Sequence, residues 1–161
     1  MAGWPVVAAA RPNASHDALA ALEAAGYVSL VITQNVDGLH QRAGQRNVID
    51  LHGNLGGVTC LDCGAQESRS ELQARLVGAN PLHAGPAQQA APDGDADPAD
   101  SIAHSLKVPT CLVCGGIVKP DVVFFGGAIP AERTEACIRA AVEAPAVLAV
   151  ELAASSSSSS P

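Results

Sequence analysis

Two Cys-x-x-Cys pairs constrain the fold of this chain more than any other feature of its sequence. They comprise Cys60 and Cys63, then Cys111 and Cys114. Four thiolates match the tetrahedral coordination that zinc prefers in structural sites. Because they fill the coordination shell, they leave no position for a reacting water molecule. The sequence therefore predicts one structural zinc ion.

A redox pair and buried free thiols are the alternatives to zinc. A redox Cys-x-x-Cys needs an exposed thiol of low pKa beside a helix N-terminus, and the Leu-Asp and Leu-Val insertions offer no such cue. Residues 64–110 separate the pairs by more than most zinc ribbons allow, but doubling a loop costs only about 0.6 kcal/mol. Cys137 falls within a predicted helix, and we expect it to be an inert buried residue.

Charge and hydropathy exclude several functional classes. The net charge is −7, whereas a general nucleic-acid binder shows a basic surface. No apolar run reaches the roughly 18 residues that span a membrane, and Met1–Pro5 lacks the features of a signal peptide. We expect no nucleic-acid partner, no membrane association and a cytoplasmic location, or a mitochondrial one in a eukaryote.

The apolar pattern predicts an alternation of helices and buried strands, which is typical of an α/β fold. Residues 1–14 resemble a loose leading segment, and Ser15 is expected to cap the first helix. Predicted helices cover 16–25, 71–77 and 132–143, and predicted strands cover 27–33, 48–53, 122–125 and 146–152.

Three polar clusters lie near the predicted strand ends. Gln34, Asn35 and Asp37 follow a strand at its carboxyl end, where open α/β sheets bind ligands; an Asx-capped turn explains them equally well. His52 precedes a glycine, which alone favours a structural role, and 119–126 alone indicates an edge strand. Of the other histidines, His40 is expected to bond locally, and solvent exposure is predicted for His16, His83 and His104.

In this order, the motifs resemble the sirtuin family of NAD-dependent protein deacylases. The matching segments are GWP at 3–5, RPNASHDALAALE at 11–23, TQNVDGLHQRAG at 33–44, LHG at 51–53, CLDC at 60–63, CLVC at 111–114 and GGIVKPDVVFFG at 115–126. The acidic segment 91–97 is similar to the class II mitochondrial and bacterial branch. The resemblance covers about residues 1–150.

The resemblance implies transfer of an acyl group from lysine to ADP-ribose with release of nicotinamide. His52 is the implied general base, Gln34 and Asn35 the implied ribose contacts, and Asp37 the implied nicotinamide contact. NAD and one structural zinc are the implied cofactors, and an acylated-lysine peptide is the implied partner. Its backbone is expected to pair with Val122, Val123 and Phe124.

The implied fold is a partial Rossmann-like doubly wound parallel sheet with a small four-cysteine zinc module. The predicted divisions are 1–56, the zinc module 57–118 with a disordered insertion at 80–104, a Rossmann-like return at 119–152 and a disordered serine tail at 153–161. The family's glycine-rich phosphate loop and adenosine contacts do not occur. We therefore expect a chain truncated at both ends. The alternative function is an inert zinc-stabilised fragment that binds peptides or partner proteins.

Overall fold

The computed structural model describes residues 3–83 and 105–150. Its elements, in chain order, are α1 (Trp4–Ala9), α2 (Ala14–Ala24), β1 (Val31–Thr33), α3 (Leu39–Arg42), β2 (Val48–Asp50), β3 (Gly53–Cys60), β4 (Gln66–Ser68), α4 (Arg69–Ala79), a 3₁₀ helix η1 (Pro81–His83), β5 (Val118–Val122) and α6 (Ala131–Glu143). The predicted mixture of helices and strands is confirmed. The serine tail and most of the predicted insertion lie outside the described residues.

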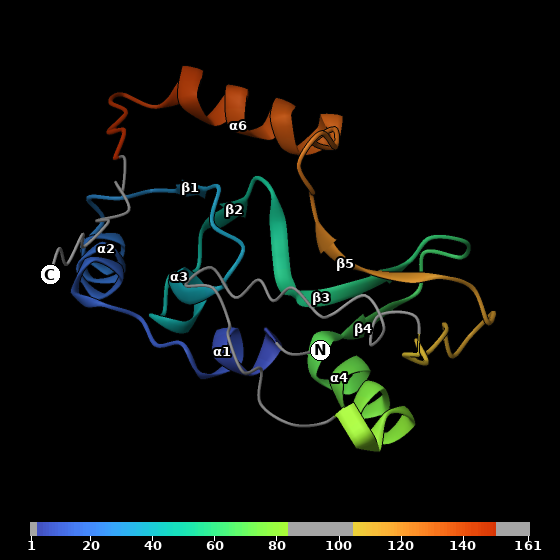
Figure 1. Cartoon of the computed structure of the whole chain (residues 1–161). Coiled ribbons are helices and arrows are strands. Elements are labelled where there is room, and N and C mark those ends of the chain that lie inside the picture. The colour runs from blue at the N-terminus through green and yellow to red at the C-terminus, as the bar shows by residue number, and fades with distance from the viewer. Residues whose placement is uncertain (1–2, 84–104, 151–161) are drawn as a thin grey trace, which may run out of the picture.

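The strands form two small sheets of opposite kind. β1 and β2 pair in parallel, whereas β3 lies between β4 and β5 in an antiparallel sheet. Figure 1 shows β3 running from the parallel pair toward the other end of the molecule. Only Leu51 and His52 separate β2 from β3. The two sheets therefore meet at the turn that carries His52.

The apolar core lies on the antiparallel sheet. The buried hydrophobic residues are Val58, Cys60, Leu72, Cys111 and Val122. Leu72 comes from α4, which lies against β3 and β4 and begins with a capping box between Ser68 and Glu71. No described helix is long and apolar enough to cross a bilayer.

The segment after α4 is ordered further than the sequence predicts. Asn80 is buried, and its side-chain amide donates to the carbonyls of Leu76 and Lys107, both at 2.8 Å. Its side-chain oxygen accepts the backbone N–H of Lys107 at 2.8 Å. Asn80 therefore connects the end of α4 to Lys107, whereas the sequence predicts that the disordered insertion begins at this residue.

Residues 3–14 are not a loose segment, because they contain α1. The Arg42 guanidinium donates to the carbonyls of Val7, Ala8 and Ala10 at the end of that helix. This cation lies at the carbonyl end of the helix, where the last acceptors lack a full set of backbone donors. A long-range side chain supplies the cap, which local sequence patterns do not reveal.

The N-cap of α2 is Asn13 and not Ser15 as predicted. Asn13 Oδ1 accepts the backbone N–H groups of Ser15 and His16, and His16 Nδ1 lies 3.3 Å from the Asn13 backbone nitrogen. His16 thus completes a reciprocal capping box. The prediction that His16 is solvated is wrong, because this geometry turns its ring inward, where it is 6% exposed.

The predicted strands at 27–33 and 122–125 are shorter or displaced. Only Val31–Thr33 forms β1, and Tyr27 is exposed. β5 begins earlier, at Val118, and ends at Val122. In the described part, β1 has β2 as its one partner. Parallel strands are stable when both faces of their sheet are covered, and a single pair does not give that cover to all seven predicted residues.

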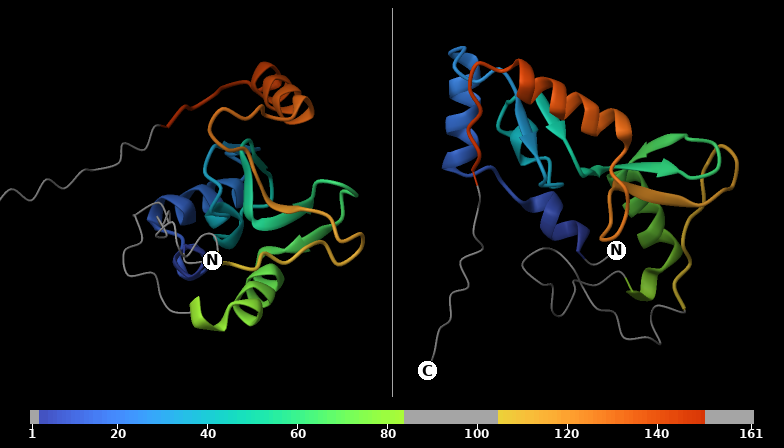
Figure 2. Two further views of the ribbon diagram at one scale, coloured as in Figure 1. Left: turned by 45° about the vertical axis from the view of Figure 1, so that its right-hand side comes forward. Right: turned by 90° about the horizontal axis from the view of Figure 1, so that it is seen from above.

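The C-terminal described segment departs furthest from prediction. α6 occupies the predicted range, but none of its residues is buried, and Cys137 is only half-buried. Residues 146–150 form no strand, and Val147, Leu148 and Val150 are exposed. A buried strand needs neighbours for its backbone groups, and no described strand pairs with this segment. Figure 2 shows α6 on the opposite side of β3 from α4.

Candidate zinc centre and nicotinamide-side site

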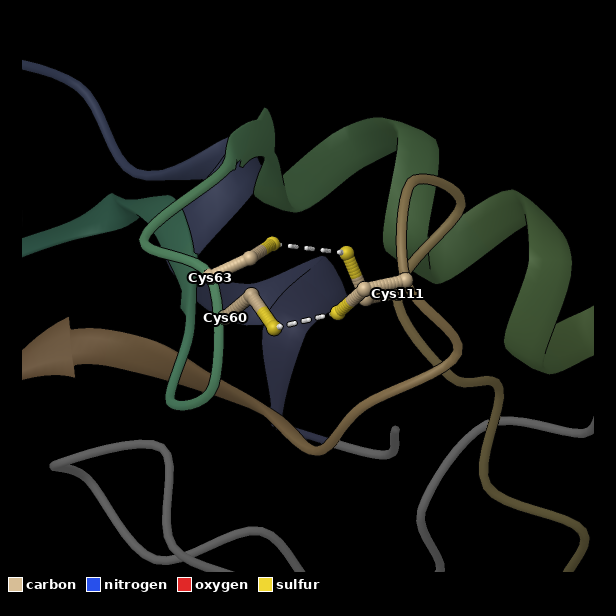
Figure 3. A group of neighbouring side chains, drawn as sticks. Cys60, Cys63 and Cys111 are labelled. Carbon is tan, nitrogen blue, oxygen red and sulfur yellow. Dashed lines mark hydrogen bonds between the residues drawn. The ribbon is translucent and has the colours of Figure 1, made fainter.

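The four cysteines of the two pairs come together as the spacing predicts. All four sulfurs lie within 4.8 Å of one another. Cys60 Sγ is 3.6 Å from Cys114 Sγ, and Cys63 Sγ is 3.7 Å from Cys111 Sγ (Figure 3). Tetrahedral zinc with bonds of about 2.3 Å separates its sulfur ligands by about 3.8 Å. The cluster therefore fits one zinc ion.

The two cysteine turns have the same backbone pattern. Gly64 N donates to Cys60 O at 3.1 Å, and Gly115 N donates to Cys111 O at 2.9 Å. Both glycines have positive φ angles, +72° and +74°, which glycine adopts without a Cβ clash. The glycine after each pair is thus required by the turn.

The cysteine turns also dock directly against each other. Leu61 N donates to Ile117 O at 2.8 Å, and Ile117 N donates to Asp62 Oδ2 at 3.0 Å. A Cβ at Gly116 would lie 2.0 Å from Asp62 Oδ2. Glycine at 116 therefore permits the approach that holds the two halves of the cluster together.

Thiol protonation differs between members of the cluster. The backbone N–H groups of Cys114 and Val113 lower the pKa of the Cys111 thiol to about 7. The Gly116 N–H lowers the pKa of Cys114, but the sulfurs of Cys63 and Cys60 outweigh it and raise that pKa to about 12. Negative sulfurs this close repel one another. A divalent cation removes that repulsion, which is the chemistry expected of a metal-binding thiolate set.

Backbone hydrogen bonds bring the polar clusters together at the other end of β3. Leu51 N donates to Thr33 O at 2.9 Å, and Leu55 N donates to Val36 O at 2.8 Å. The segment 33–37 therefore lies along the turn that carries His52. His52 is half-buried in this turn.

The segment after β5 reaches the same turn. Val123 N donates to His52 O at 2.8 Å, and Gly53 pairs with Val122 in the β3–β5 register. Gly53 has φ +87°, and a Cβ there would lie 2.0 Å from Asp121 O. The glycine after His52 therefore lets β5 approach. Its requirement comes from this tertiary contact and is not visible in the local sequence.

The predicted nicotinamide-side residues follow β1 with differing exposure. Gln34 and Asn35 are exposed, and Asp37 is half-buried. Asp37 Oδ1 accepts the backbone N–H of Leu39 at 2.9 Å, which orients its carboxylate at the start of α3. Asn35 N donates to Thr33 Oγ1 at 3.1 Å. Amide and carboxylate groups on a bent loop offer both donors and acceptors to a polar ligand.

The predicted peptide-pairing residues lie at and directly after the end of β5, which is an edge strand of the sheet among the described residues. The Val122 side chain is buried, Val123 is half-buried and Phe124 is 58% exposed. A cavity of about 230 Å³ is lined by Lys119, Val123 and Phe124 among others. An edge strand beside a cavity suits pairing with an extended peptide.

Sequence reasoning missed the residues that support these groups. Asp121 and Arg133 form an ion pair at 3.1 Å that ties α6 to β5. Asp50 and Asn54, on either side of His52, hydrogen-bond at 3.0 Å. A cavity of about 400 Å³ is lined by these four residues and Gly53, together with others. Asp50, Asn54 and Asp121 lie within or next to motif segments, whereas Arg133 lies in α6, outside all of them.

A family comparison identifies the family to which the chain belongs. Residues 3–157 match the Sir2 family, and the chain belongs to that family. The expected resemblance to sirtuins is thereby confirmed.

Several similar bacterial proteins are described as NAD-dependent protein deacetylases. One from Xanthomonas campestris pv. campestris (strain 8004) is 50% identical over 150 residues, covering 93% of this chain and 51% of the relative. One from Bordetella bronchiseptica (strain ATCC BAA-588 / NCTC 13252 / RB50) is 51% identical over 150 residues, covering 93% of this chain and 55% of the relative. The chain spans about half the length of the curated relatives it matches.

Solved structures give the same result. A Sir2 protein with a p53 peptide and NAD+ is similar at a TM-score of 0.63 and 30% identity, over 87% of this chain and 47% of that one. A Sir2 protein bound to an acetylated peptide is similar at a TM-score of 0.63 and 29% identity, over 85% of this chain and 46% of that one. The arrangement of elements is thus that of sirtuins.

Proposed function

We propose that this chain supplies the zinc module, the peptide-pairing strand and the nicotinamide-side residues of an NAD-dependent protein-lysine deacylase. The observation that carries the proposal is the gathering of three motifs at one turn. Bonds from Leu51 to Thr33, Leu55 to Val36 and Val123 to His52 join segments that are far apart in sequence. The names of the relatives support the same activity.

His52 is the proposed general base. Imidazole is the side chain that most often accepts a proton in such a role. Its backbone carbonyl is held by Val123 N, so the segment proposed to pair with the peptide and the proposed base share one hydrogen bond. This link supports a role for His52 beside the bound acyl-lysine.

Gln34, Asn35 and Asp37 are the proposed cofactor residues. NAD, when bound, supplies the ribose that receives the acyl group. The exposed amides of Gln34 and Asn35 can donate to and accept from ribose hydroxyls. The Asp37 carboxylate, oriented by the Leu39 N–H, can accept from an amide such as the carboxamide of nicotinamide.

The zinc ion is proposed to be structural. Gly53 pairs with Val122 and Cys60 pairs with Val118 in the β3–β5 register, so roughly 13 Å of strand separates the metal-binding end from the His52 turn. The metal therefore acts by holding β3 and β5 in register. We also propose an acylated-lysine peptide as the partner, paired along Val122, Val123 and Phe124.

Calorimetric titration of the zinc-loaded chain with NAD, followed by a nicotinamide-release assay with an acetylated peptide, tests the proposal. We expect saturable NAD binding and release that His52→Ala abolishes. Tyr27→Ala, which changes an exposed ring, is the control and is expected to retain release. Nicotinamide release that survives His52→Ala would overturn the assigned base.

The second candidate is an inert zinc-stabilised protein that binds peptide alone. The exposure of Ile138 and Val142 on α6, and of Val147 beyond it, favours this candidate. These apolar side chains are not buried against the parallel pair, so they form no apolar core beside the proposed NAD site. Peptide binding without NAD binding or nicotinamide release would favour this candidate.

A further inference from the structure

The turn that carries His52 is closed by a side-chain bond between its two flanking residues. Asn54 Nδ2 donates to Asp50 Oδ2 at 3.0 Å across Leu51, His52 and Gly53. Both flanking residues are half-buried, so solvent screens this bond less than it would an exposed one. The bond restricts the backbone on both sides of His52 at once.

Each end of this bond is anchored to a different element. Gln41, on α3, donates through Nε2 to both oxygens of Asp50 at 3.0 and 2.9 Å. Asn54 Oδ1 accepts the Gly56 backbone N–H at 2.8 Å. The Asp50 carboxylate therefore receives donors from α3 and from β3, while lying at the end of β2.

The same pair also contacts the loop that carries the proposed cofactor residues. A Cβ at Gly38 would lie 3.2 Å from Asn54 Nδ2. Gly38 precedes α3 and follows Asp37 directly. Asn54 thus packs against the loop after Asp37, and a shift of the pair would move that loop and the His52 turn together.

We propose that Asp50 and Asn54 are positioning residues, and that their hydrogen bond holds His52 and the segment 34–38 in one fixed geometry. The proposal deepens the deacylase function and rests on it for its catalytic consequence. Neither residue needs to touch substrate. They act through the turn between them, since a reacting group displaced by 1 Å can lose most of its rate advantage.

The proposal can be tested by exchanging the donor and the acceptor of this hydrogen bond between positions 50 and 54. Asn54→Asp sets two carboxylates against each other and should break the bond. In the double variant Asp50→Asn/Asn54→Asp, the amide Nδ2 at 50 donates to the carboxylate at 54, which still accepts from Gly56. The amide oxygen at 50 keeps one of the two bonds from Gln41 Nε2. The double variant therefore restores the bond with donor and acceptor exchanged. Asp50→Asn alone is the milder variant, and Gln66→Glu, exposed on β4, is the matched charge control.

The primary measurement is NMR of the zinc-loaded chain, which needs no activity. In Asn54→Asp we expect amide exchange of Leu51 and Leu55 to rise about tenfold and the His52 ring signal to broaden or divide. The double variant should return both to wild type. Exchange at the Cys60 amide, which bonds to Ala65 at the zinc end, should stay unchanged throughout.

Nicotinamide release gives the second readout. For Asn54→Asp we expect kcat to fall by a larger factor than KM rises, and we expect both to recover in the double variant. If no variant or wild type turns over, the deacylase proposal fails while the NMR series still tests the bond. Unchanged Leu51 exchange and an unchanged His52 signal in Asn54→Asp would overturn the inference. So would a swap that fails to restore them. If Asn54→Asp loses zinc, Asp50→Asn and the swap are compared with wild type instead.

Discussion

The zinc end and the parallel end of the molecule bury different kinds of residue. Every buried hydrophobic residue of the described part belongs to the antiparallel sheet, α4 or the cysteine turns. Around the parallel pair the buried residues are polar, namely His16, Thr33, His40 and Gln45. The first region is held mainly by apolar packing beside the cysteine cluster, with Arg69 and Asn80 as its buried polar residues. The second is held by individual hydrogen bonds. A region without an apolar core depends on neighbours for its stability.

Two histidines and a glutamine form one group of contacts in the polar region. The rings of His16 and His40 lie 4.7 Å apart, and His40 Nδ1 bonds to Gln45 Oε1 at 2.7 Å. The predicted local bond of His40 is thereby confirmed. Gln45 Nε2 is buried without a hydrogen-bond partner in the described structure, an energetic cost that an apolar core would not carry.

The largest expected effect comes from removing one zinc ligand. Cys60→Ala leaves three thiolates and an apolar side chain in the cluster. Structural zinc contributes about 10–16 kcal/mol of apparent binding free energy in small modules, so we expect loss of zinc and unfolding of the antiparallel sheet. Elemental analysis and circular dichroism under reducing conditions measure both.

Cys137→Ser is the matched control for that change, because Cys137 lies outside the cluster. It should retain one zinc per chain and the wild-type melting temperature. Full zinc content in Cys60→Ala would show that the four sulfurs are not the ligand set.

The next largest effect tests whether the two ends of β3 are independent. In Gly53→Ala, the new Cβ overlaps Asp121 O and the residue keeps a positive φ. The positive φ alone costs roughly 1–2 kcal/mol, and the overlap adds to it. We expect a lower unfolding free energy and lost peptide binding with zinc content unchanged, measured by urea titration and elemental analysis.

Gly78→Ala provides the control, since Gly78 lies in α4 with nothing within 4 Å of the added Cβ. It should stabilise the protein by about 0.5–1 kcal/mol. Loss of zinc in Gly53→Ala would show that the two ends unfold together and would erase the contrast between them.

A smaller effect is expected at the link between α6 and β5. Arg133→Ala removes the ion pair with Asp121. The Arg133 side chain is 29% exposed and the Asp121 side chain is 40% exposed. Such pairs contribute about 0.2–1 kcal/mol and weaken with salt. Hydrogen exchange should rise across α6 and change little in α4.

Arg139→Ala, an exposed change on the same helix, should leave exchange in α6 near wild type. If Arg133→Ala behaves the same, α6 is held by contacts other than the ion pair. The measurement therefore shows how α6 is attached to the rest of the chain.

The smallest effect concerns acid sensitivity of the parallel end. The Glu23 carboxylate accepts the backbone N–H groups of Arg46 and Asn47, which lower its pKa. A lowered pKa stabilises the fold above the unfolded value of about 4.3, and this stability disappears as the pH falls through the folded pKa. The free energy of unfolding should therefore fall less for Glu23→Gln than for wild type when the pH is lowered from neutral to acid.

Urea midpoints at the two pH values measure that difference. Glu71→Gln at the α4 cap is the counterpart at the zinc end, since bonds from Ser68 lower the Glu71 pKa in the same way. An identical pH dependence in wild type and Glu23→Gln would show that the Glu23 carboxylate does not stabilise the parallel end.

Part of the site could be predicted because its signals are local. The cysteine turns and the helix over 132–143 follow from residues adjacent in sequence. The Asp50–Asn54 bond could not be predicted, because it depends on how two strands of different sheets meet. The capping role of His16 was also missed, since the usual pattern has glutamate or glutamine at that position.

The sequence alone determined the metal chemistry and the order of the motifs, because ligand type and turn geometry depend on a few neighbouring residues. The tertiary structure decided which strands form, which side chains are buried and that His52 lies beside the segment 33–37 and Val123. Those outcomes depend on hydrogen bonds between residues distant along the chain. Such bonds form only when the packing of both sheets brings their partners together, which local propensity does not encode.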